Sequence, residues 1–180
     1  MLKNHSKSKS GFTIIEVVLV LAIAGLIFLM VFLALPALQR SQRDTQRRDD
    51  LSGFSTQITN YQSNNRGKVP SSTGIDTKVN GNGWGAFLKN YMRQLPEDSI
   101  NIPDTEGEGE FIDPDGTNYI INDKGDYTNY TAPTDFDHTI YVYHKGKCEG
   151  ENVVEATGSN RQLAFVYKLE GGGVFCGSNS

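Results

Sequence analysis

The stretch KSGFTIIEVVLVLAIAGLIFLMVFLALP, residues 9–36, decides the fold because it is almost entirely apolar. Residues 17–35 contain no charged side chain, and extending the run back to Phe12 gives 24 residues. At about 1.5 Å of rise per residue, such a helix is roughly 36 Å long. The hydrocarbon core of a bilayer is about 30 Å thick. The stretch therefore predicts a membrane-spanning helix.

The same helix is predicted to continue well beyond the apolar run. A secretory signal peptide would have a shorter apolar core and a small-residue cleavage site after it, and neither feature is present. Residues 39–50 instead hold seven charged side chains, and apolar residues then recur every three or four positions at Leu51, Phe54, Ile58 and Tyr61. One helix from about Phe12 to Asn64 is expected, with a bend or a short melted segment near residues 32–36 because Pro36 removes a backbone hydrogen bond.

The rest of the chain predicts a small α+β domain. The chain has 180 residues and a formal net charge of -4, which suits one globular domain plus an appendage. A loop is expected over residues 66–83, followed by a short amphipathic helix that starts at Trp84 and stops before Pro96. Alternating apolar residues predict strands, at 139–145, 161–169 and 173–176. We expect an antiparallel sheet whose apolar face packs on the second half of the long helix; that face comprises Leu163, Phe165, Tyr167 and Leu169.

The flanking charges leave the orientation of the span open. Lys3, Lys7 and Lys9 precede it, but four arginines follow it and compete under the positive-inside rule. Cys148 and Cys176 form a single pair in the distal domain, as expected for a disulfide in an oxidising compartment. Two free thiols are the alternative. The cysteines favour a carboxyl-terminal domain outside the cytoplasm.

Glu16 lies almost at the start of the apolar run. A charge at the centre of a bilayer costs at least about 2.5 to 3.5 kcal/mol, so an acid in a membrane helix is a functional hypothesis that requires a partner. The alternative is that Glu16, near the edge of the span, reaches the lipid headgroups at modest cost. Sequence context favours the first interpretation.

That context is GFTIIE, residues 11–16, which follows a short basic leader and precedes the apolar run. The arrangement resembles the class III signal of type IV prepilins and pseudopilins. The resemblance implies that a prepilin peptidase cuts between Gly11 and Phe12, that Phe12 is then N-methylated, and that Glu16 is the assembly carboxylate. The new amine on Phe12 would lie at the depth of the carboxylate of a neighbouring subunit, and such a pair in a low dielectric fixes axial register between helices.

Several weaker patterns were considered for chemistry. Residues 113–126 (DPDGTNYIINDKGD) resemble an acidic calcium loop, but Lys124 stands where the bidentate acid should be, so turn formation is the better explanation. His138 and His144, near Asp135 and Asp137, offer too few ligands for a metal site. No catalytic constellation and no phosphate loop is found, so we expect no enzyme activity and no cofactor.

The charge of the distal domain limits its partners. From residue 51 onward, 10 Lys and Arg stand against 17 Asp and Glu, which predicts no direct binding of nucleic acid. The resemblance implies other partners: copies of the chain in a helical homopolymer, other pilins, prepilin peptidase, an assembly platform with its ATPase, and the inner membrane before assembly.

The domain boundaries expected from these patterns are residues 1–11 for the leader, 12–35 for the transmembrane and assembly half of the helix, 36–64 for its amphipathic half, and 65–180 for the extracytoplasmic head. The predicted fold is the type IV pilin fold. The predicted function is a structural subunit of a type IV pilus that supports adhesion or motility. The alternatives are a pseudopilin of a type II secretion or DNA-uptake system, a minor tip pilin, and a membrane-anchored exported enzyme.

Overall fold

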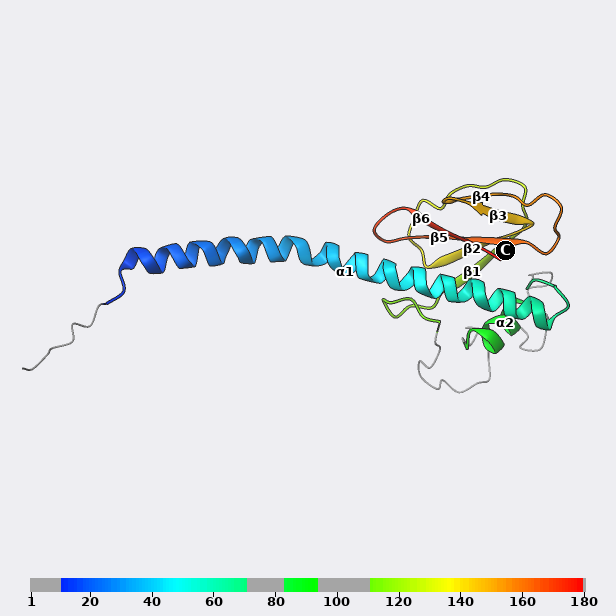
Figure 1. The fold of residues 1–180 in the computed structure, drawn as a ribbon, viewed down its shortest axis with the longest axis horizontal. Helices are drawn as coiled ribbons and strands as arrows, with labels where there is room; N and C mark the ends of the chain where they lie inside the picture. Colours follow the sequence, from blue (N-terminus) through cyan, green and yellow to red (C-terminus); the bar gives the residue numbers. More distant parts are fainter. Residues whose placement is uncertain (1–10, 71–82, 94–110, 180) are drawn as a thin grey trace, which may run out of the picture. The chain divides into compact units, whose positions relative to one another are not determined.

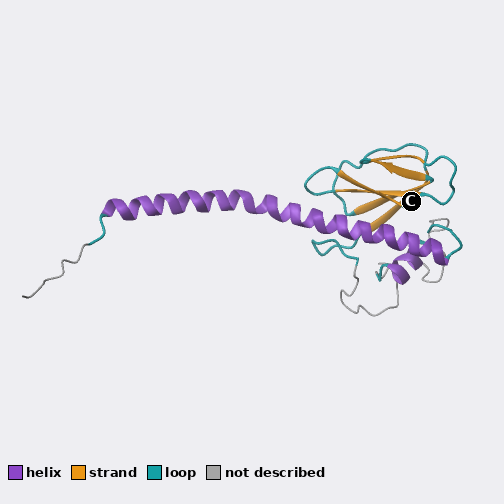
Figure 2. Ribbon diagram, in the orientation of Figure 1, coloured by secondary structure: helices purple, strands orange, loops and turns teal. Residues whose placement is uncertain are grey.

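The computed structural model describes residues 11–70, 83–93 and 111–179. It consists of two helices and six strands (Figure 1, Figure 2), namely α1 (Ile14–Asn64), α2 (Trp84–Tyr91), β1 (Ile120–Asp126), β2 (Thr139–His144), β3 (Gly146–Glu149), β4 (Asn152–Glu155), β5 (Leu163–Lys168) and β6 (Val174–Ser178). The chain divides into two compact units, residues 1–39 and 40–180, and the boundary falls inside α1. The predicted α+β class is confirmed.

The long helix is confirmed almost to the residue. It starts two residues after the expected position and ends at Asn64 as expected. The helix is uninterrupted through Pro36, so the structure shows no melted segment at residues 32–36. The physical reason is that proline removes a single donor, while its fixed φ of about −65° is itself helical.

The main core lies between the second half of α1 and one face of the sheet. The predicted faces do meet: Leu51, Phe54 and Ile58 of α1 share one buried cluster with the alternate side chains of β5 and with α2. Phe54 is at the centre, with ring centroids 4.9 Å from Phe165 and 5.5 Å from Phe87. Burying a large apolar side chain stabilises the fold by about 1.5 to 3 kcal/mol, so this cluster attaches α1 to the sheet.

The sheet has the strand order β1-β2-β5-β6. Strands β2, β5 and β6 are antiparallel neighbours, as predicted, with Val142 opposite Phe165. Strand β1 was not predicted, and it pairs parallel to β2 with Ile121 opposite Ile140. Its sequence, IINDKGD, looks like a turn because it carries Asn, Asp and Gly, and only pairing with β2 makes it a strand. The sheet is therefore mixed, with one parallel edge.

The opposite face of the sheet carries a second, smaller core. Tyr143, Ala164 and Val166 lie there with Val153 of β4, because successive side chains on a strand point to opposite faces. The hairpin β3–β4 covers part of this face, on the side of the sheet away from α1 (Figure 1). This hairpin was also missed, since its residues 146–155 are mostly polar.

The ring of Phe165 lies over Gly177, its partner on β6. A side chain at position 177 would place its Cβ 2.3 Å from that ring, so glycine is required there.

The segments between α1 and the sheet match the predictions from the sequence where the structure describes them. The helix α2 is confirmed and ends at Tyr91. Leu95 and Pro96 lie outside the described residues, as does most of the predicted loop 66–83. Trp84 of α2 donates from Nε1 to Asp123 Oδ2 at 2.8 Å. This bond ties the short helix to the unexpected strand β1.

Candidate functional site

The apolar half of α1 is exposed along its whole described length. Phe12 is 89% exposed, Leu33 74% and Phe28 66%. The helix is long and apolar enough to cross a membrane, and no residue in its most apolar stretch is buried by the rest of the protein. An uncovered apolar surface of this size marks a site of contact with lipid or with another protein.

Glu16 lies in the first turn of this helix and is held by Thr13. The backbone N–H of Thr13 donates to Glu16 Oε2 at 2.9 Å, and the Thr13 hydroxyl donates to the same oxygen at 2.8 Å. A glutamate that reaches back three residues to a threonine N-cap is one half of a capping box. The sequence analysis did not consider Thr13, although the spacing T-x-x-E at 13–16 predicts this contact.

The bond between Gly11 and Phe12 lies just before the helix. Both residues are exposed and have no regular secondary structure, and a Cβ at Gly11 would touch nothing within 4 Å. The leader residues 1–10, with Lys3, Lys7 and Lys9, lie outside the described residues. Gly11 and Phe12 are therefore accessible to a peptidase.

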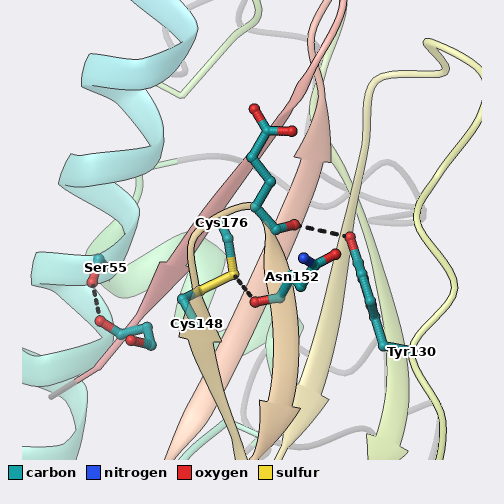
Figure 3. Close-up of a disulfide and its surroundings, with 7 residues drawn as sticks. Ser55, Tyr130, Cys148, Asn152 and Cys176 are labelled. Carbon is teal, nitrogen blue, oxygen red and sulfur yellow. Dashed lines mark hydrogen bonds between the residues drawn. A yellow bond between two sulfur atoms is a disulfide. The ribbon is translucent and has the colours of Figure 1, made fainter.

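Cys148 and Cys176 form the predicted disulfide (Figure 3). It joins β3 to β6, and Cys176 Sγ also contacts the Asn152 carbonyl at 3.6 Å. The crosslink closes a loop with a sequence separation of 28 and connects the hairpin β3–β4 to the edge strand of the main sheet. The disulfide therefore links the two sheets covalently.

A buried cluster of charged side chains joins the middle of α1 to the other elements of the compact unit 40–180. Arg47, which is fully buried, donates from Nε and Nη2 to the two oxygens of Asp113 at 2.7 Å each, and from Nη1 to Asp44 and Glu170 at 3.0 Å each. Its guanidinium also lies 4.5 Å from the centre of the Phe136 ring. This cluster was not predicted, because Asp113 and Glu170 are 66 and 123 residues from Arg47 along the chain.

The charged groups in the cluster shift one another's pKa values. Burial alone would raise the pKa of Asp113, but hydrogen bonds from Arg47, the Asp115 N–H and Tyr167 outweigh burial and hold this pKa below its ordinary value. Glu170 accepts from Arg43 at 2.8 Å, and this hydrogen bond, with that from Arg47, lowers the pKa of Glu170 to about 2. Asp113 and Glu170 are therefore deprotonated at neutral pH and paired with arginines, so the cluster acts as a structural clamp.

The two histidines lie in different parts of the head. His144 bonds to Asp123 at 2.9 Å, whereas His138 lies 3.4 Å from Asp115 and 3.7 Å from Asp113, so the two histidines belong to separate clusters. Asp113, Asp115 and His138 are close enough to share an ion. The oxygens of Asp113 already accept from Arg47, Tyr167 and the Asp115 N–H, which uses the lone pairs that a metal would need.

Comparison with known proteins bears on the amino-terminal residues. A family model described as the prokaryotic N-terminal methylation motif matches residues 6–32. The chain carries a type IV prepilin-like signal peptide. No curated protein and no solved structure matches the chain. The motif supports a type IV pilin-like or pseudopilin protein, which is a structural class, and the long apolar helix, the sheet domain and the disulfide fit the pilin fold.

The same motif implies two kinds of partner. It implies processing by prepilin peptidase and assembly with other pilins. With the exposed apolar helix, it also fits anchoring in a membrane before assembly.

Proposed function

We propose that the chain is a structural subunit of a type IV pilus. Prepilin peptidase cuts between Gly11 and Phe12, the new amino terminus on Phe12 is methylated, and the helix then polymerises with copies of itself. The observation that carries this proposal is Glu16, the single carboxylate on an otherwise uncharged helix half whose apolar side chains are exposed; Glu16 lies within the matched methylation motif.

The role of Glu16 follows from the charge that cleavage creates. Cleavage removes the leader lysines and leaves an amine at Phe12, four residues from Glu16. In a filament core of low dielectric, this cation and the carboxylate of a neighbouring copy attract each other strongly, and either charge alone is penalised. The pair fixes axial register, while the apolar side chains supply the packing. We infer that residues 12–35 form the assembly half, that residues 36–64 connect it to the head at 65–180, and that the head lies outside the cytoplasm.

Subunit extraction from lipid needs work, which an assembly platform and its ATPase supply in this proposal. A pseudopilin of a secretion or DNA-uptake filament, or a minor pilin at the tip, would use the same amino-terminal chemistry. Abundance separates these roles, since a major pilin makes up most of a sheared filament. A filament on the cell surface supports adhesion or twitching motility.

The decisive experiment separates the charge of Glu16 from its contact with Thr13. Glu16→Gln keeps an oxygen that accepts from the Thr13 N–H but has no charge, and Thr13→Ala keeps the charge but removes the hydroxyl donor. We expect Glu16→Gln and Glu16→Ala to insert into the membrane and to yield no filaments in negative-stain images, while Thr13→Ala still assembles.

Amino-terminal sequencing of sheared wild-type filaments should give N-methylated Phe12. Normal filament yield from Glu16→Gln would show that capping, rather than charge, is the role of Glu16. A full-length leader on the shed protein would contradict the proposal as a whole.

A further inference from the structure

The sheet face opposite α1 has an open pocket beside the area that the hairpin β3–β4 covers. The pocket has a volume of about 480 Å³. Its floor consists of Tyr141 and Tyr143 of β2 with Lys124 of β1, and its wall is the segment 128–137. Ligand pockets in proteins are typically about 300 to 1,000 Å³ in volume, so this one can hold a ligand of one or two small rings.

The segment that forms the wall is anchored on both sides. Tyr130 donates from its hydroxyl to the Glu151 carbonyl in the turn between β3 and β4, at 3.1 Å (Figure 3). At the other end, the oxygens of Asp137 accept from the Tyr141 hydroxyl at 2.6 Å and from the Thr139 N–H at 3.1 Å. The hydrogen bond to Asp137 raises the pKa of Tyr141 to about 12, so its phenol stays protonated. The pocket is thus formed before any ligand arrives.

The polar groups at the rim are short and varied. They comprise hydroxyls, an amide and carboxylates, from Thr128, Asn129, Thr131, Thr134, Asp126 and Asp135. Among the described residues, the Asn129 amide and the Lys124 ammonium have no hydrogen-bond or salt-bridge partner. Together these groups present both donors and acceptors around an aromatic floor.

The charges restrict the class of ligand. Three carboxylates around the pocket, Asp126, Asp135 and Asp137, disfavour an anion such as a phosphate. A cationic ligand is disfavoured at the floor, because the Lys124 ammonium already lies 4.9 Å from the centre of the Tyr141 ring. A neutral ligand with many hydroxyls fits both conditions, since each hydroxyl can donate to a carboxylate and accept from an amide or ammonium.

We propose that this pocket binds a neutral carbohydrate of one or two sugar residues. The sugar lies over Tyr141 and Lys124, and its hydroxyls bond to Asn129, Asp135 and the Lys124 ammonium. Such a site would allow the head to contact a glycan surface. Binding does not depend on filament assembly, so the two proposals fail independently.

The test uses the full-length chain, solubilised in a detergent without a sugar headgroup. Saturation-transfer NMR and calorimetry are run with lactose, cellobiose, maltose and N,N′-diacetylchitobiose, and with glucuronate and glucosamine as charged comparisons. We expect at least one neutral disaccharide to bind with a Kd of about 0.1 to 10 mM.

Two exposed rim variants, Asn129→Ala and Asp135→Ala, should each weaken that binding about five- to tenfold, as the loss of one hydrogen bond does. Asn152→Ala, an exposed asparagine outside the pocket, is the matched control and should bind as the parent does. Three results would each overturn the proposal. The first is that none of the four disaccharides binds at about 10 mM. The others are that both rim variants bind as well as the parent, or that a charged sugar binds more tightly than the neutral ones.

Discussion

The two halves of α1 have the same secondary structure and opposite surroundings. Along residues 12–38 the large apolar side chains are between 44% and 89% exposed. In the second half, Leu51, Phe54 and Ile58 are fully buried against the sheet and α2. The difference shows that the second half completes its core within one chain, whereas the first half needs lipid or another protein to cover it. Substitutions that affect one half and spare the other test this division.

The largest effect on folding is expected at Phe54, which is fully buried and contacts four aromatic rings. Phe54→Ala should lower the free energy of unfolding by about 3 to 5 kcal/mol, through lost burial and the cavity left behind. Urea unfolding of the full chain in detergent, followed by the fluorescence of the single tryptophan, Trp84, measures this change. Phe28→Ala is the matched control: it should leave the unfolding of the head unchanged, and an equal loss from both would break the division.

Arg47→Met should lower the free energy of unfolding by about 3 to 5 kcal/mol, because it leaves buried Asp113 without its cationic partner. The control is Arg40→Met. Arg40 is 60% exposed and lies 3.7 Å from Glu170, so its loss should cost about 0 to 1 kcal/mol. The same urea titration measures both, and equal losses would show that the buried cluster is not the clamp.

Removal of the disulfide should destabilise the head by about 2 to 4 kcal/mol in the chain-entropy estimate. The variant carries Cys148→Ala together with Cys176→Ala. The wild-type chain in reductant should unfold at the same urea concentration as this variant. A wild-type chain whose unfolding is indifferent to reductant would contradict the assignment of a stabilising crosslink.

The smallest effect expected is pH dependence from Glu170. Its pKa is lowered from 4.5 to about 2 in the folded state, so it stabilises the fold above about pH 4.5, and this contribution is lost as the pH falls towards 2. Glu170→Gln should be less stable than wild type at pH 7, and the gap should narrow between pH 4.5 and 2. The comparison is made by unfolding at several pH values, and a constant gap would show that the charge of Glu170 contributes nothing.

Features with a local signal could be predicted from the sequence. The helix α1 follows from an uncharged run and a repeat of three or four residues, and β2 and β5 follow from alternating apolar residues. The contact between Thr13 and Glu16 was predictable as well, since its T-x-x-E spacing is local.

The remainder depends on contacts between distant residues. Strand β1 exists because β2 pairs with it, and its own residues favour turns. Arg47 and Asp113 are 66 residues apart, and the sequence around either residue does not predict their contact. The pocket at Tyr141 likewise combines a strand floor with a wall from a separate segment, so only the folded chain assembles it.

The carboxylate of Asp44 accepts the backbone N–H groups of Glu170 and Gly171, at 3.0 and 2.7 Å, in the turn that links β5 to β6. The unit boundary within α1 falls between Gln39 and Arg40, and residues 40–47 are the first of the helix to form ion pairs with the loops of the head. Any tension applied along the apolar half must enter the head through this point. The hydrogen-bonded ion pairs of Arg43 and Arg47, rather than the apolar contacts of Leu51 and Phe54, are therefore the first tertiary contacts to bear mechanical load.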